Sequence, residues 1–156
     1  MTDLWRFALA TWRLSDVEAT CLQLQDDYQV SAALLLCGCW LGRKGYPLHP
    51  PLAKILSARA FEWEQQRLAP LRALRRAAGQ QAPWAEWKRL LQDAELEAEH
   101  LLMTELEEAV SAQPRAEDAP VSENWLLLLV PDAATCEGQA TLLARLWLAV
   151  QSGEAF

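Results

Sequence analysis

The chain has 156 residues, 52% of them hydrophobic and 22% charged, and 14 Lys and Arg against 21 Asp and Glu give a net charge of −7. This length fits one domain able to fold around its own core without a disulfide or a metal, and the apolar content excludes a disordered chain. An acidic chain repels phosphate, so we expect no binding to nucleic acid.

The first quarter of the chain predicts two amphipathic helices, because apolar residues recur there at spacings of three and four. The first helix starts after Thr2 or Asp3. The second opens at Ser15, with Glu18 three residues later in a capping-box pattern, and ends before Asp26.

The segment 31–42 carries no charged residue. A helix that is apolar all round belongs in the middle of a bundle, so we place this one at the centre of the fold. Gly38 and Gly42 are four residues apart and lie on one face, where a neighbouring helix can approach closely. Gly45 and the prolines after it end the helix.

Residues 51–112 predict a long helical hairpin. Pro70 must kink or split its first arm, and Gly79 ends that arm. Pro83 starts the second arm, the longest helix of the chain. Basic residues gather between 67 and 89 and acidic ones between 93 and 108, so the arms should pair across the hairpin, for example Arg67 with Glu95 and Arg76 with Glu86.

The C-terminal part begins with a polar linker at 113–120, bounded by prolines. The apolar run 125–130 lacks a partner strand and predicts a short buried helix, and 138–150 predicts a last amphipathic one. The fold class is therefore all-α: a compact multi-helix bundle of about six to eight helices, in one domain spanning 1–156.

Three features of the sequence indicate the cellular compartment. Charged residues interrupt the first 14 positions, unlike a secretion signal. The longest uncharged apolar run, 32–41, is half of the ~20 residues that a membrane span needs. The four cysteines lie inside apolar helical patterns, which indicates reduced, buried thiols and a cytoplasmic protein.

Known catalytic motifs are missing from the sequence: it has no GxSxG, no P-loop and no GxGxxG. Glu97 and His100 share a helical face as in di-metal sites, but a second such pair is lacking, so we expect no metal. Cys37 and Cys39 point roughly 200° apart on a helix and are better core fillers than ligands. No catalytic, metal-binding or cofactor-binding residue is predicted.

The leading hypothesis is a non-enzymatic cytoplasmic interaction or regulatory protein, whose partner is another protein or a second copy of the chain. Tryptophan and arginine are enriched at interface hot spots, and the candidate partner-binding surface comprises Trp5, Arg6, Trp40, Arg72, Arg75 and Arg76. The alternative is a carrier with a Trp- and Leu-lined pocket beside Cys37 for a small apolar ligand or cofactor. An enzyme that acts through converging carboxylates ranks third.

Several segments resemble a family of small proteobacterial proteins known as a domain of unknown function: 3–9 (DLWRFAL), 17–26, 34–42 and 70–76 (PLRALRR). The resemblance spans about residues 3–110. The family's usual Pro-Gly turn is replaced here by Arg13–Asp16, and the C-terminal third matches poorly. The resemblance implies an all-helical protein and carries no catalytic residues to transfer.

Overall fold

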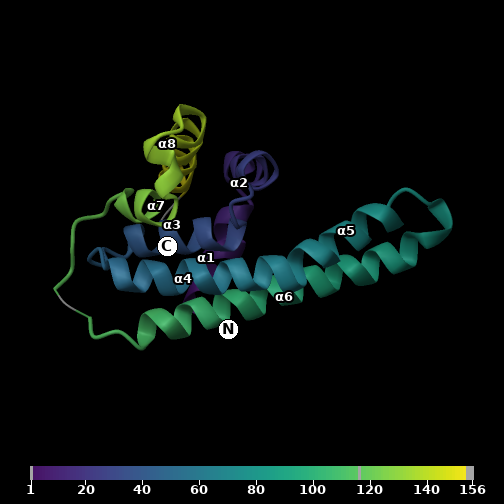
Figure 1. The fold of residues 1–156 in the computed structure, drawn as a ribbon, viewed down its shortest axis with the longest axis horizontal. Helices are drawn as coiled ribbons and strands as arrows, with labels where there is room; N and C mark the ends of the chain where they lie inside the picture. Colours follow the sequence, from purple (N-terminus) through teal and green to yellow (C-terminus); the bar gives the residue numbers. More distant parts are fainter. Residues whose placement is uncertain (1, 116, 154–156) are drawn as a thin grey trace.

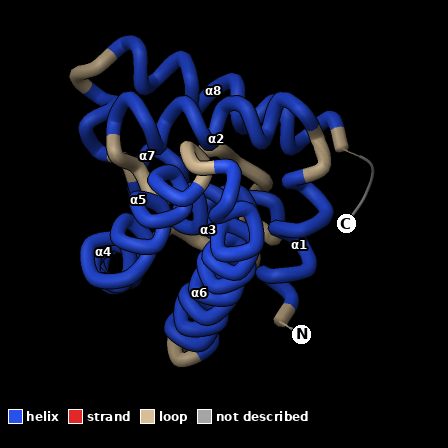
Figure 2. Tube along the Cα trace, turned by 90° about the vertical axis from the view of Figure 1, so that its right-hand side faces the viewer, coloured by secondary structure: helices blue, strands red, loops and turns tan. Residues whose placement is uncertain are grey.

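The computed structural model describes residues 2–115 and 117–153. Its elements are, in chain order, α1 (Asp3–Trp12), α2 (Ser15–Tyr28), α3 (Ala32–Arg43), α4 (Pro50–Trp63), a π-helical turn (Glu64–Leu68), α5 (Ala69–Ala78), a 3-10 turn (Ala82–Trp84), α6 (Ala85–Ser111), α7 (Asn124–Leu129), a second 3-10 turn (Pro131–Ala134) and α8 (Glu137–Ser152). The described chain contains no strand, which confirms the all-α prediction and the predicted number of helices (Figures 1 and 2).

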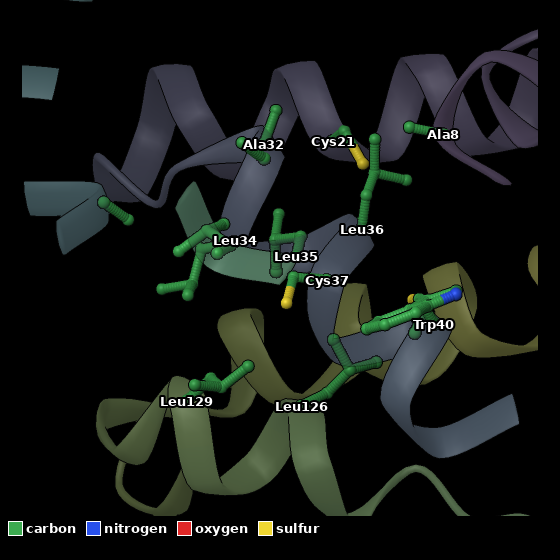
Figure 3. Packing of buried hydrophobic residues seen from close by; sticks show 14 of the residues in the cluster. Ala8, Cys21, Ala32, Leu34, Leu35, Leu36, Cys37, Trp40, Leu126 and Leu129 are labelled. Carbon is green, nitrogen blue, oxygen red and sulfur yellow. The ribbon is translucent and has the colours of Figure 1, made fainter. Parts of the chain in front are cut away.

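The charge-free helix α3 lies at the centre, as predicted. Ser31 caps it, because its hydroxyl accepts a hydrogen bond from the Leu34 N–H at 3.2 Å. Every residue from Ala32 to Gly42 is buried, and α1, α2, α4, α6 and α7 all pack against the helix. In Figure 3, α1 and α2 lie on one side of α3 and α7 on the other.

The two glycines of α3 allow the close approach that their spacing predicts. A Cβ atom at Gly38 would lie 3.0 Å from Leu126 Cδ2, and one at Gly42 would overlap the carbonyl oxygen of Ser122. The side of α3 that carries the glycines is therefore covered by α7 and by the residues that lead into it. Burial of the Leu126 and Leu129 side chains against α3 completes this contact.

The predicted hairpin is confirmed: α4 and α5 run antiparallel to α6, and its far end projects from the body (Figure 1). Pro70 has no N–H to continue the helical ladder. Just before it the chain forms the π-helical turn, in which the Ala69 N–H bonds to the carbonyl of Glu64, five residues earlier. The break predicted at Pro70 thus takes the form of a wider turn.

Four local predictions are wrong. The second helix does not end before Asp26, because α2 continues to Tyr28. Ser15 is the first residue of α2 and does not cap it, because the N-cap position is Leu14 and makes no side-chain hydrogen bond. Arg67 lies 4.0 Å from Glu62 and not near Glu95, and Arg76 pairs at 3.2 Å with Asp26 of α2 and not with Glu86. The reason is the orientation of α5, which turns other arginines toward α6.

The segment between α6 and α7 is fastened to the end of α3. The N–H of Ala119 donates to the carbonyl of Gly45 at 2.7 Å, and the N–H of Ser122 donates to that of Gly42. Gly45 has a φ of 68°, a conformation that favours glycine. The C-terminal helix α8 then packs along α2 (Figure 2). Within residues 2–115 and 117–153, none of the helices combines the length and the apolar composition of a membrane span.

Candidate functional site

The six residues predicted to form a partner-binding surface fall into two separate groups. In the first, Trp5 and Trp40 are buried in the core. Trp40 Nε1 donates to Asp3 at 3.2 Å, and the Trp5 ring stacks on His100 with the ring centres 4.6 Å apart. Arg6 is exposed and lies 3.7 Å from Asp3. These tryptophans stabilise the start of α1 instead of presenting a surface.

The start of α1 is held by two more charged groups. Both the Asp3 and Leu4 N–H groups donate to the Glu107 carboxylate, at 3.2 and 2.8 Å. Negative charge is favourable at this end of a helix. Lys44 binds the Asp3 carboxylate at 2.8 Å, and this hydrogen bond keeps the pKa of Asp3 below its usual value. The charged groups at the start of α1 therefore have a structural role, which is to hold this end of the helix in place.

The second group lies on α5, where Arg72 and Arg75 belong to a buried charge cluster and Arg76 is exposed and pairs with Asp26 at 3.2 Å. Arg72 is only 8% exposed. It donates to Glu64 at 2.6 Å and to the side-chain oxygen of Gln25 at 3.3 Å, and it lies 3.5 Å from Glu95. Arg75 donates to Glu95 at 2.5 Å. We call these five residues, Gln25, Glu64, Arg72, Arg75 and Glu95, the buried charge cluster.

Burial and ion pairing shift the pKa of Arg72 in opposite directions. Burial alone would lower the pKa of Arg72, but its hydrogen bond to Glu64 and the nearby carboxylates outweigh this, and the net effect raises the pKa. Glu99, one turn after Glu95 on α6, responds differently. Burial, reinforced by the charge of Glu95 and opposed by Arg72, raises the pKa of Glu99 to about 7.

A cleft of about 480 Å³ opens beside Arg72, between α2, the α4–π–α5 arm and the α7 end with its 3-10 turn. Its buried lining residues are apolar except for Ser31 and Arg72, and they include Leu34, Ala60 and Val130. Its other lining residues mix charged, apolar and uncharged polar side chains, and four of the last kind are glutamines: Gln25, Gln29, Gln65 and Gln139. Phe61 also lines this cleft, although its side chain is 68% exposed.

A second, smaller hollow lies between α1, α3 and α6. It measures about 70 Å³ and is apolar except for Glu99. Trp5, Trp12, Leu36, Leu96 and Met103 are among its lining residues, and it shares none of them with the cleft. We call it the Glu99 groove.

The described residues offer little for metal or thiol chemistry. No three His, Cys, Asp or Glu side chains in ranges 2–115 and 117–153 come together as a metal site requires. Glu97 and His100 lie 3.5 Å apart on a solvent-facing part of α6. Burial raises the pKa of Cys37 to about 12, so its thiol stays protonated, and Cys37 lines neither the cleft nor the groove.

The sequence predicted an ion pair for Glu95 but assigned it to Arg67 in place of Arg72 and Arg75. It missed Glu64 and Glu99. A signal near Glu64 was present, because Pro70 interrupts the helical hydrogen bonds, and irregular turns within helices are frequent at functional sites. For Glu95 and Glu99 the acidic stretch of the sequence was the only signal. The glutamines around the cleft come from three distant segments and gave no local signal.

Taken together, fold and site define an all-helical bundle with a polar cleft next to a buried ion-pair cluster. The chain belongs to the family described as "Protein of unknown function (DUF2390)", whose model matches residues 3–106. This match confirms the resemblance seen in the sequence and extends from α1 through most of α6. Searches of curated proteins and of solved structures each found no match to the chain.

Proposed function

We propose that the protein is a non-enzymatic interaction protein of the cytoplasm, which holds an extended segment of a partner protein in the cleft beside Arg72. The observation that carries this proposal is the lining of the cleft, which combines buried apolar side chains with four glutamines from α2 and its C-cap, the π turn and α8. A peptide needs both kinds of contact, because it buries side chains and must satisfy its main-chain N–H and C=O groups.

Glutamine suits this role because its amide is both donor and acceptor and so can pair with either main-chain group. The volume of about 480 Å³ lies in the range of ordinary ligand sites and accommodates a few residues. Phe61, exposed at 68%, adds an aromatic side chain of the kind enriched at interfaces. The charged lining residues carry both signs, Arg76 beside Asp26, which favours a partner segment without strong net charge.

The cysteines support the proposed location in the cytoplasm, which is a reducing compartment. None of the four, all within the described residues, forms a disulfide, and Cys21, Cys37 and Cys39 are buried. The alternative role as a carrier has less support. An apolar cavity of roughly 150 Å³ holds benzene, whereas the Trp-lined groove measures about 70 Å³ and Cys37 does not line it.

Site-specific photo-crosslinking tests the proposal. Benzoylphenylalanine replaces Phe61 in one variant and Leu148 in a matched control, since Leu148 is 69% exposed and does not line the cleft. In native lysate we expect one discrete adduct at position 61 that excess unmodified protein removes. An adduct of twice the chain mass would identify a second copy as the partner. Equal labelling at both positions, or none at 61, would overturn the proposal.

A further inference from the structure

Two exposed tryptophans mark the projecting end of the hairpin. Among the eight tryptophans of the chain, all of which lie within the described ranges, only Trp84 and Trp87 are exposed, at 45% and 43%. They lie in the 3-10 turn and the first turn of α6, and their rings meet edge to face with the ring centres 5.7 Å apart. Leu90, one turn further along α6, is exposed as well. The hairpin therefore presents an apolar surface at the end that projects from the body (Figure 1).

The polar edges of these two indoles are unused within the protein. The buried Trp40, Trp63 and Trp125 each donate their indole N–H to an acceptor in the chain, at 3.2, 2.9 and 2.8 Å. The indole N–H groups of Trp84 and Trp87 donate to none of the described residues. An apolar ring with a free polar edge is favoured where apolar material meets polar groups, as in the interfacial region of a lipid bilayer.

The shape of this end also suits a lipid surface. Residues 79–92 project from the body and line neither the cleft nor the Glu99 groove. A protein partner would have to supply a pocket that encloses both indoles, whereas the soft interfacial region of a bilayer takes up a projecting apolar group without one.

The charges at this end select an anionic surface. Lys88, next to Trp87, forms no ion pair among residues 2–115 and 117–153. Arg76 and Arg89 do pair with carboxylates, but all the side chains in these pairs are more than half exposed. Exposed ion pairs are weak, so lipid phosphates can compete for both guanidinium groups. Because the whole chain has a net charge of −7, an anionic surface repels it unless this end approaches first.

We propose that the end of the hairpin inserts into the headgroup region of an anionic membrane, with Trp84 and Trp87 at the level of the lipid carbonyls and Lys88 at the phosphates. A second copy of the chain fits this surface less well. Each indole exposes roughly 100 Å², so a contact between two such ends buries several hundred Å², less than the ~1,000 Å² of a stable interface. The inserted residues share none with the cleft, so either proposal can fail without the other.

Flotation of the full chain with vesicles tests the proposal. Vesicles of phosphatidylcholine with about one third phosphatidylglycerol should bind it at least about fivefold more strongly than pure phosphatidylcholine. Trp84→Ala/Trp87→Ala should lower the partition coefficient about tenfold or more, because it removes most of the inserted apolar area. Lys88→Gln should lower it about fivefold. The matched controls Leu148→Ala on α8 and Lys54→Gln on α4, both at exposed positions outside the hairpin end, should leave it unchanged. Circular dichroism checks that every variant is folded.

Fluorescence quenching by lipids brominated near the headgroup locates the inserted residues. We expect these lipids to quench part of the tryptophan emission of the wild type and much less of that of Trp84→Phe/Trp87→Phe, because the other six tryptophans stay outside the bilayer. The proposal is overturned if neither kind of vesicle binds, if both bind equally, if the controls lose as much binding as the tryptophan variant, or if both proteins are quenched alike.

Two measurements without lipid distinguish other occupants of the same surface. Saturable binding of polyglutamate or of single-stranded DNA that is lost in Trp84→Ala/Trp87→Ala would assign the surface to an acidic macromolecule and overturn the proposal. Self-association in sedimentation experiments that disappears in this variant would assign it to a second copy of the chain, with the same consequence. We expect neither.

Discussion

Replacing Arg72 by methionine tests whether the buried charge cluster holds the hairpin to the body. Methionine keeps a long, flexible stem but removes the guanidinium that binds Glu64 at 2.6 Å and approaches Glu95 at 3.5 Å. Their side chains are only 16% and 13% exposed, so water cannot fully replace the lost partner. Breaking a buried pair of this kind costs about 3–5 kcal/mol. Because Glu95 keeps its contact with Arg75, we expect the lower end, about 3 kcal/mol.

Urea unfolding followed by circular dichroism at pH 7 measures this loss. The matched control is Arg89→Met, since Arg89 also contacts two carboxylates but is 57% exposed in its side chain, and exposed pairs contribute about 1 kcal/mol or less. The double variant Arg72→Met/Glu64→Gln should recover part of the stability, because it removes the carboxylate left without a partner. A loss in Arg72→Met no larger than that in the control would refute the reasoning.

Four further predictions concern stability and reactivity. Gly42→Ala should lower the melting temperature, because the added methyl overlaps a backbone carbonyl and overpacking costs about 1–3 kcal/mol. Thr20→Val should stabilise by about 1 kcal/mol in urea unfolding, because its buried hydroxyl has no hydrogen-bond partner among the described residues; an unchanged midpoint would contradict this. Folding raises the pKa of Glu99 from its ordinary 4.5 to about 7, so its contribution to stability is full below pH 4.5 and is lost as pH rises through 7. In Glu99→Gln the fall in unfolding free energy between pH 5 and pH 8 should therefore be shallower, and an identical pH profile would be evidence against it. A thiol reagent at pH 8 should label the half-buried Cys136 in the native protein and reach Cys37 only in urea, as peptide mapping would show.

The helices could be predicted because their signals are local. The charge-free run 31–42, Pro70 and Gly79 mark elements that the structure shows at those places. The ion pairs of the hairpin could not be predicted, because they depend on how α5 is rotated about its axis. The π turn before Pro70 holds an extra residue, which shifts the direction of every later side chain by about 100°. Arg72 and Arg75, which follow this turn, contact Glu95 of α6, whereas Arg76 is turned toward Asp26 of α2.

The sequence also could not show which tryptophans are buried in the core and which are exposed on the surface. Tryptophan is enriched both in cores and at interfaces, so composition alone gives no preference. Trp5 and Trp40 lie in the core, whereas Trp84 and Trp87 at the end of the hairpin are exposed. The cleft was beyond the sequence for another reason, since its lining comes from segments more than a hundred residues apart that only the tertiary fold brings together.

The two glycines of α3 show where the core of the protein depends on residues beyond the family match. The family match ends at residue 106, yet Gly38 and Gly42 are covered by Ser122 and α7, which lie beyond it. A helix without any charge cannot leave one side in water, since each 100 Å² of apolar surface exposed costs roughly 2.5 kcal/mol. A relative that keeps both glycines therefore needs a cover of its own at this place. The pair thus marks the side of α3 against which the chain beyond the family match packs in this protein.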